Sequence, residues 1–124
     1  MPTNGNHPSE PIELTAPAVA DRLRAGDPIT LLDVREPAER AFAAIPAPSS
    51  SGDLFIPMGE APSRIDEIRE ALAHGPVIVY CHHGVRSMMV AQWLAAQGLD
   101  GAINLAGGID AWSVEVDPTV PRYR

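Results

Sequence analysis

The residues best suited to chemistry surround the only cysteine of the sequence, Cys81. The residues that follow it are His82, His83, Gly84, Val85, Arg86 and Ser87. Cysteine reacts as a thiolate, and nearby positive charge or hydrogen-bond donors favour that form. We therefore predict that this segment is an active-site loop with Cys81 as its nucleophile, rather than the site of a buried structural cysteine.

The segments on either side of this loop explain how it would work. Residues 76–80 are apolar and rich in β-branched side chains, which predicts a buried strand, and residues 88–97 are predicted to form a helix. Between a strand and a helix, the N–H groups of residues 82–87 can converge on one point, and the helix adds the positive end of its dipole. We expect these groups to bind an anionic substrate and to lower the pKa of Cys81.

Two adjacent histidines in the loop raise the question of a metal site. His82 and His83 are next to each other, and adjacent residues rarely point at one ion. No second cluster of cysteine or histidine accompanies them. We therefore predict no metal and no cofactor. Whether these histidines supply charge or a hydrogen bond, or only line the rim, stays open.

Asp33 and Arg35 form a second group of interest, at the end of a predicted strand over 29–34. In open α/β sheets, ligands bind outside the carboxyl ends of the strands, and both Asp33 and Cys81 lie at such ends. We expect Asp33 and Arg35 to form an ion pair or a cap that braces the loop, rather than to take part directly in catalysis.

Composition limits the possible partners. The chain has 124 residues and a formal net charge of −7, which argues against a nucleic acid or an anionic membrane surface. One cysteine cannot form an internal disulfide, and no apolar run reaches the length of a membrane helix. We therefore expect a soluble, cytoplasmic protein in a reducing setting.

Strands and helices are predicted to alternate along the chain. Strands are expected at 11–14, 29–34, 54–56, 76–80 and 102–105. Helices are expected at 16–25, 37–44, 63–73, 88–97 and 107–112, with Thr15 and Ser63 as N-caps. This alternation predicts an α/β layer structure with a mainly parallel sheet.

The remaining segments are expected to be irregular. Residues 1–10 are polar and are predicted to form a mobile leader before a single domain over 11–124. The proline-, serine- and glycine-rich residues 45–53 are predicted to form a surface loop, and the residues after Trp112 an irregular tail.

Four motifs together resemble the rhodanese-like family of sulfurtransferases. They are the DVREPAE run at 33–39, the Ile-Pro pairs at 45–46 and 56–57, the loop VYCHHGVRS at 79–87 and the run NLAGGIDAW at 104–112. The resemblance covers residues 11–124. Two departures are the alanines Ala43 and Ala44, where the family often has Gly-His, and a longer spacing between the Ile-Pro pairs, which falls in the serine-rich insertion 47–53.

The resemblance implies a three-layer fold, with a five-stranded, mainly parallel sheet flanked by helices. It implies that Cys81 carries sulfur as a persulfide, taken from a small anionic donor such as thiosulfate and given to cyanide, a thiol or a protein thiol. In this setting Arg86 can pair with the sulfonate oxygens of the donor and stabilise the thiolate. The alternative for Arg86 is a solvated or purely structural arginine.

Two other functions stay open from the sequence. A phosphatase or arsenate reductase of the same fold would also use a cysteine and an arginine in one loop, but the loop from Cys81 to Arg86 is one residue shorter than that of cysteine phosphatases. The shorter loop favours a single sulfur atom over a tetrahedral phosphate. The other possible function is that of a sulfur-carrying or regulatory module with little turnover of small molecules.

Overall fold

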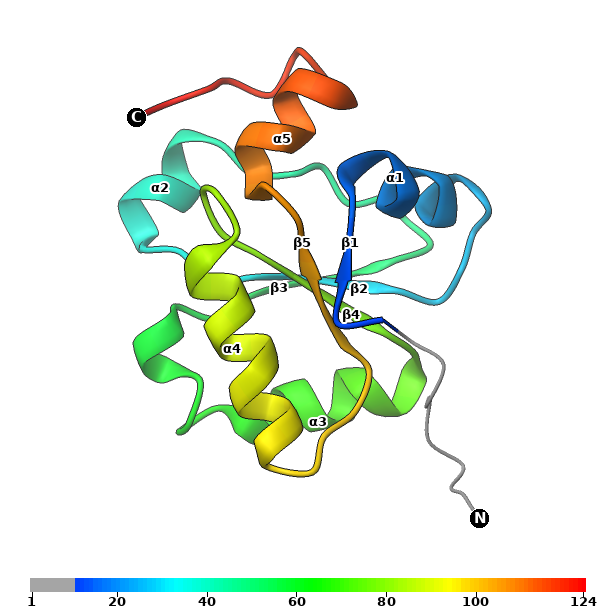
Figure 1. Cartoon of the computed structure of the whole chain (residues 1–124), viewed down its shortest axis with the longest axis vertical. Helices are drawn as coiled ribbons and strands as arrows, with labels where there is room; N and C mark the ends of the chain where they lie inside the picture. Colours follow the sequence, from blue (N-terminus) through cyan, green and yellow to red (C-terminus); the bar gives the residue numbers. More distant parts are fainter. Residues whose placement is uncertain (1–10) are drawn as a thin grey trace.

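The computed structural model describes residues 11–124 (Figure 1). The predicted leader over residues 1–10 lies outside the described residues. No helix within 11–124 has the length and apolar character needed to cross a membrane.

The core of the protein is a five-stranded sheet in which every pair of neighbours is parallel. The strands are β1 (Glu13–Leu14), β2 (Thr30–Asp33), β3 (Gly52–Phe55), β4 (Val77–Tyr80) and β5 (Ala102–Leu105). Their order across the sheet is β1-β5-β4-β2-β3, which places β4 at the centre. Because the strands are parallel, all their carboxyl ends meet at one edge of the sheet, and Cys81 lies at that edge.

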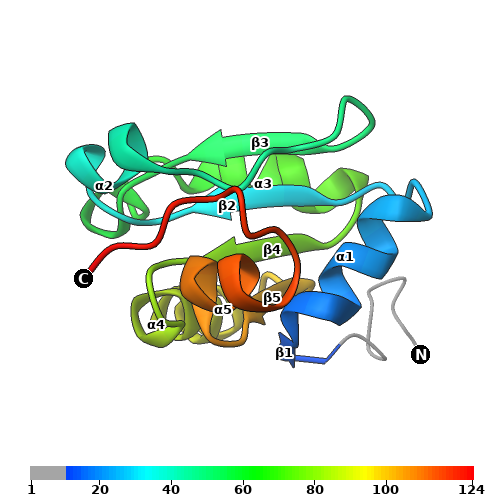
Figure 2. The ribbon, with the colours of Figure 1, turned by 90° about the horizontal axis from the view of Figure 1, so that it is seen from above.

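Helices cover both faces of the sheet, as Figures 1 and 2 show. The helices are α1 (Ala16–Arg24), α2 (Pro37–Phe42), α3 (Ile65–His74), α4 (Val85–Ala96) and α5 (Gly108–Glu115). Buried side chains of α1 and α5 pack on one face, and those of α3 and α4 pack on the other. The predicted three-layer α/β architecture is therefore confirmed.

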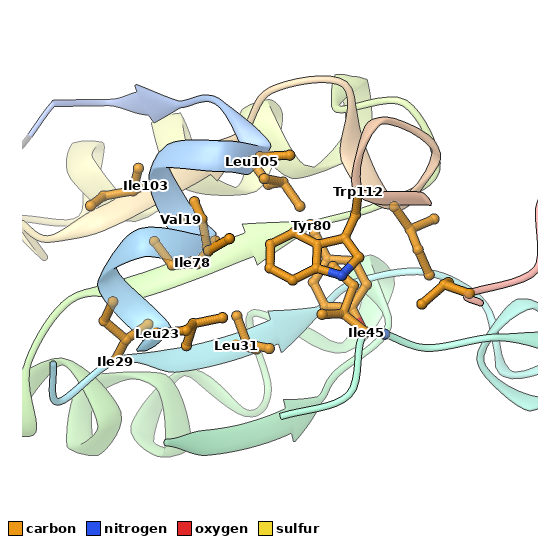
Figure 3. Close-up of a cluster of buried hydrophobic side chains, with 14 of the residues drawn as sticks. Val19, Leu23, Ile29, Leu31, Ile45, Ile78, Tyr80, Ile103, Leu105 and Trp112 are labelled. Carbon is orange, nitrogen blue, oxygen red and sulfur yellow. The ribbon is translucent and has the colours of Figure 1, made fainter. Parts of the chain in front are cut away.

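Alternating side chains of the central strands build two separate cores. In β4, Ile78 and Tyr80 point to the α1–α5 side, where Trp112 also packs (Figure 3), while Val77 and Val79 point to the α3–α4 side. All the residues of β4 are buried. This packing on both faces fixes the end of β4, and therefore the position of the cysteine that follows it.

Several predicted boundaries are confirmed. Thr15 caps α1 by accepting a hydrogen bond from the N–H of Ala18 through its side chain, at 3.3 Å. The predicted strand over 102–105 is β5. Capping residues and short, mostly apolar segments are local signals, which explains why the sequence predicted these boundaries.

Other boundaries are corrected by the structure. Ser63 does not cap α3, because its hydroxyl donates to the Glu60 carbonyl at the end of the short 3-10 helix η1 (Met58–Glu60). The third strand starts at Gly52, not at 54, and so takes the last two residues of the predicted surface loop. The helix expected to end at Trp112 continues to Glu115.

The correction nearest the site concerns α4, which begins at Val85 rather than at 88. Val85, Arg86 and Ser87 therefore belong to the first helical turn and not to the loop. The loop itself is short, because Gly84 ends it with a left-handed backbone, φ +96°, at the N-cap of α4.

Candidate active site

Cys81 follows β4 directly and is 1% exposed. Its sulfur lies where the central strand ends and α4 begins, close to the positive end of that helix. The predicted nucleophile therefore lies at the strand-to-helix turn, as the sequence indicated.

Three hydrogen bonds converge on the Cys81 sulfur. The N–H of Gly84 donates to Sγ at 3.1 Å, the N–H of Ser87 at 3.4 Å and the hydroxyl of Ser87 at 3.3 Å. Two backbone donors and one side-chain donor thus hold the sulfur from the first turn of α4. The sequence predicted N–H donors from 82 to 87, and the structure brings those of Gly84 and Ser87 to the sulfur.

The start of α5 holds the other side of the loop. The N–H groups of Ile109 and Asp110 donate to the carbonyls of Cys81 and His82, at 2.9 and 3.1 Å. A Cβ at Gly108 would lie 2.4 Å from each of these carbonyl oxygens, so only glycine permits this approach. The first turn of α5 therefore satisfies the carbonyls of Cys81 and His82 and fixes the backbone of the loop.

These surroundings favour the thiolate of Cys81. Burial is the largest influence and raises the pKa of the thiol, but the hydrogen bonds from Ser87 and Gly84 and the positive charge of Arg86 together outweigh it. The pKa of Cys81 therefore lies below the ordinary value of a thiol. Nucleophilic reactions of Cys81 should thus increase as the pH rises through this lowered pKa.

We expect Ser87→Ala to raise the pKa of Cys81. The variant removes a hydroxyl donor worth about 1.5 kcal/mol to a charged acceptor, which corresponds to about one pKa unit. Thiolate absorbance followed against pH measures this shift. Ser113→Ala is the matched control, because Ser113 is also buried but its hydroxyl donates to the Val120 carbonyl. Equal pKa values in both variants would contradict the assignment.

A chain of hydrogen bonds that runs from the buried interior to the surface positions the Ser87 hydroxyl. Asn104 accepts from this hydroxyl through Oδ1, and its Nδ2 donates to Glu13 Oε2 at 2.8 Å and to the Gly84 carbonyl at 3.2 Å. Since a hydroxyl carries one proton, ionisation of Cys81 favours its donation to the charged sulfur over donation to Asn104. Glu13 and Asn104 were not predicted as site residues, because their contacts join distant parts of the chain.

Arg86 forms a bidentate ion pair with Glu39 of α2. The two terminal nitrogens of Arg86 donate to the two carboxylate oxygens of Glu39, at 2.8 and 2.9 Å. Glu39 also accepts from the hydroxyl of Tyr123 at 2.8 Å. Arg86 therefore links the first turn of α4 to α2 and, through Glu39, to the C-terminal segment, which lies beside α2 in Figures 1 and 2.

Tyr123 is a site residue that the sequence did not indicate. It lies in the tail that was predicted to be irregular, and its ring stacks on His82 with centroids 3.9 Å apart. Its hydroxyl accepts from Arg35 at 2.9 Å. No local signal marks these contacts, because they join the end of the chain to residues of three earlier segments.

The predicted ion pair between Asp33 and Arg35 is present and fully buried. Arg35 donates to both carboxylate oxygens of Asp33, at 2.8 and 2.7 Å, and to the Ala43 carbonyl at 2.6 Å. Arg35 thus braces α2 and, through Tyr123, the tail. These contacts support the structural role that was expected for both residues.

His82 and His83 lie face to face at the rim of the loop. Their rings stack with centroids 3.8 Å apart, and their nitrogens lie within 4.8 Å of each other and of an Asp110 oxygen. Both carboxylate oxygens of Asp110 already accept from Arg122, at 2.8 and 3.1 Å. Burial, together with the charge of His83, lowers the pKa of His82. We assign no metal to this group, and its absence stays a prediction.

Comparisons with known proteins point to one family. The family model described as Rhodanese-like domain matches residues 15–115. Rhodanese-like/PpiC domain-containing protein 12 of Arabidopsis thaliana is 38% identical over 98 residues, which cover 78% of this chain and 31% of that protein. A protein of Allochromatium vinosum named Sulfurtransferase is 35% identical over 101 residues, covering 82% of this chain and 87% of that protein.

The fold comparison agrees. The crystal structure of a rhodanese-like domain protein from Staphylococcus aureus matches with a TM-score of 0.70 and 27% identity, covering 90% of this chain and 98% of that one. The chain therefore spans most of two of these proteins but less than a third of the Arabidopsis protein.

Proposed function

The chain belongs to the rhodanese-like domain family, and from this membership and the site geometry we propose that it is a sulfurtransferase that works through a persulfide on Cys81. The observation that carries the proposal is the buried sulfur held by three hydrogen bonds at the start of α4. The likeness to the Allochromatium protein named Sulfurtransferase supports it.

The first half of the proposed reaction loads the cysteine. The Cys81 thiolate attacks the outer sulfur of thiosulfate, the sulfur–sulfur bond of the donor breaks, and sulfite leaves with the electron pair. A new sulfur–sulfur bond forms, and the negative charge moves to the outer sulfur of the persulfide. Gly84 and Ser87 hold the thiolate in position for attack, and the charge of Arg86 favours its ionised form.

The second half of the proposed reaction transfers the sulfur from the Cys81 persulfide to an acceptor. A thiophilic acceptor, either cyanide or a thiolate, attacks the outer sulfur of the persulfide. The bond to Cys81 breaks, and the thiolate returns to its starting state. The same donors that lowered the pKa of the free thiol make Cys81 a good leaving group, because they stabilise the departing thiolate.

Formation of thiocyanate from thiosulfate and cyanide tests this proposal. We expect steady turnover, with a rate that falls as the pH drops through the lowered pKa of Cys81, because protonation removes the nucleophile. Absence of turnover together with hydrolysis of an aryl phosphate would contradict the proposal and support a phosphatase. Absence of turnover, with persulfide loaded by a partner desulfurase, would support a sulfur carrier.

A further inference from the structure

The guanidinium of Arg86 acts on the charge of the Cys81 thiolate, and its fork already holds an anion. Both terminal nitrogens of Arg86 donate to Glu39, at 2.8 and 2.9 Å. The Arg86 side chain is 35% exposed, so a solute can reach it. A guanidinium binds a carboxylate and an oxyanion of sulfur with the same fork geometry. The two therefore compete for the same nitrogens.

Glu39 is held firmly in this position. Besides the two bonds from Arg86, it accepts from the Tyr123 hydroxyl at 2.8 Å and from the N–H of Glu36 at 3.1 Å. The bonds from Arg86 are the largest cause that lowers the pKa of Glu39, to about 2, so the carboxylate is ionised at neutral pH. The carboxylate of Glu39 is thus charged at neutral pH and held by donors from three residues.

Tyr123, which donates to the same Glu39 oxygen as Arg86, is itself fixed. Its hydroxyl accepts from the fully buried Arg35 at 2.9 Å, and its ring contacts two other rings. It stacks on His82 at 3.9 Å and meets the edge of Phe42 at 5.6 Å. The tail therefore prevents Glu39 from turning away from Arg86 easily.

We propose that Glu39 is the specificity-determining residue for the charge of the sulfur donor, because it occupies the Arg86 fork that an anionic donor needs. A donor carrying an oxyanion has to displace Glu39 and also meets its negative charge. An uncharged donor reaches Cys81 without displacing Glu39 and without being repelled by its charge. The inference rests on the proposed function, because it concerns the sulfur donor. The effect of the Glu39 charge is tested separately, by alkylation of Cys81.

The test compares two alkylating reagents of similar size and different charge. Iodoacetate and iodoacetamide both alkylate the Cys81 thiolate through a methylene carbon, and iodide leaves. Only iodoacetate carries a carboxylate. The ratio of their rate constants cancels changes in thiolate fraction and in access. We expect Glu39→Gln to raise the iodoacetate-to-iodoacetamide ratio about tenfold, the equivalent of one charge-assisted hydrogen bond.

The matched control is Glu115→Gln, which makes the same charge change at the exposed end of α5 that is remote from the loop. The ratio should stay at the wild-type value in this control. An unchanged ratio in Glu39→Gln, or an equal rise in both variants, would overturn the inference. The first result would show that Glu39 does not compete for Arg86, and the second that only net charge matters.

Tyr123→Phe gives a second route to the answer if Glu39→Gln does not fold. It keeps the ring on His82 and removes the hydroxyl that holds Glu39, so the ratio should rise, but by less than in Glu39→Gln. The KM for thiosulfate should fall in both variants, and it should fall further in Glu39→Gln than in Tyr123→Phe. If no variant transfers sulfur but the alkylation ratio rises, the proposed function fails and the charge effect stands. If the variants transfer sulfur but the alkylation ratio and the KM for thiosulfate are unchanged, the charge effect fails and the proposed function stands.

Discussion

Cys81→Ser should reduce sulfur transfer by at least about a thousandfold while leaving the fold intact. The serine hydroxyl ionises far above neutral pH, and an oxygen at this position cannot form the persulfide that carries the transferred atom. The residue is the only cysteine of the chain, so no second thiol can replace it. The thiocyanate assay with thiosulfate and cyanide measures the loss.

Folding of this variant has to be measured separately, because Cys81 is buried. Serine is close in size to cysteine, and the N–H groups of Gly84 and Ser87 can donate to its oxygen as they do to the sulfur. We expect thermal unfolding near the wild-type midpoint and an unchanged circular dichroism spectrum. Transfer at more than a few per cent of the wild-type rate in a folded variant would refute the role of Cys81.

Asp33→Ala should destabilise the fold by about 3–5 kcal/mol, because it leaves a buried guanidinium without its carboxylate partner. Arg35 and Asp33 are both fully buried and share a bidentate ion pair. Arg35 also holds the Ala43 carbonyl and the Tyr123 hydroxyl, so loss of Asp33 should loosen the segments around the site as well. Urea unfolding measures the free energy.

The chain offers a matched control for this substitution. Asp21 and Arg24 form an ion pair at 3.0 Å on the surface of α1, with side chains 76% and 67% exposed. Asp21→Ala removes an equivalent pair from solvent, where the expected change is within about 1 kcal/mol. A free-energy loss at Asp33 no larger than that at Asp21 would contradict the bracing role of the buried pair.

Much of the fold could be predicted because its signals are local. The continuous apolar run that became β4 is short and rich in β-branched residues, as buried parallel strands are. The strand–helix alternation then determines a layered α/β fold. Prediction from local residue preferences failed where contacts between distant segments determine the bounds of an element. Gly52 and Asp53 are poor strand formers, but they extend β3 because they pair with Thr30 and Leu31 of β2.

The candidate site divides in the same way. Cys81 and its donors lie within one stretch of sequence, and a strand followed by a loop and a helix predicts their convergence. Tyr123 reaches Glu39 across 84 residues, and Glu13 reaches Asn104 across 91. Contacts at such separations leave no periodic or capping pattern, so only the folded chain reveals them.

The most direct test of the account is the intact mass of the purified protein before and after exposure to thiosulfate, with Cys81→Ser measured beside it. We expect the wild type to gain one sulfur atom, the variant to gain none, and cyanide to remove the added sulfur as thiocyanate. Retention of the original mass, in a protein whose Cys81 still reacts with iodoacetamide, would contradict the proposed loading of Cys81 by a small sulfur donor.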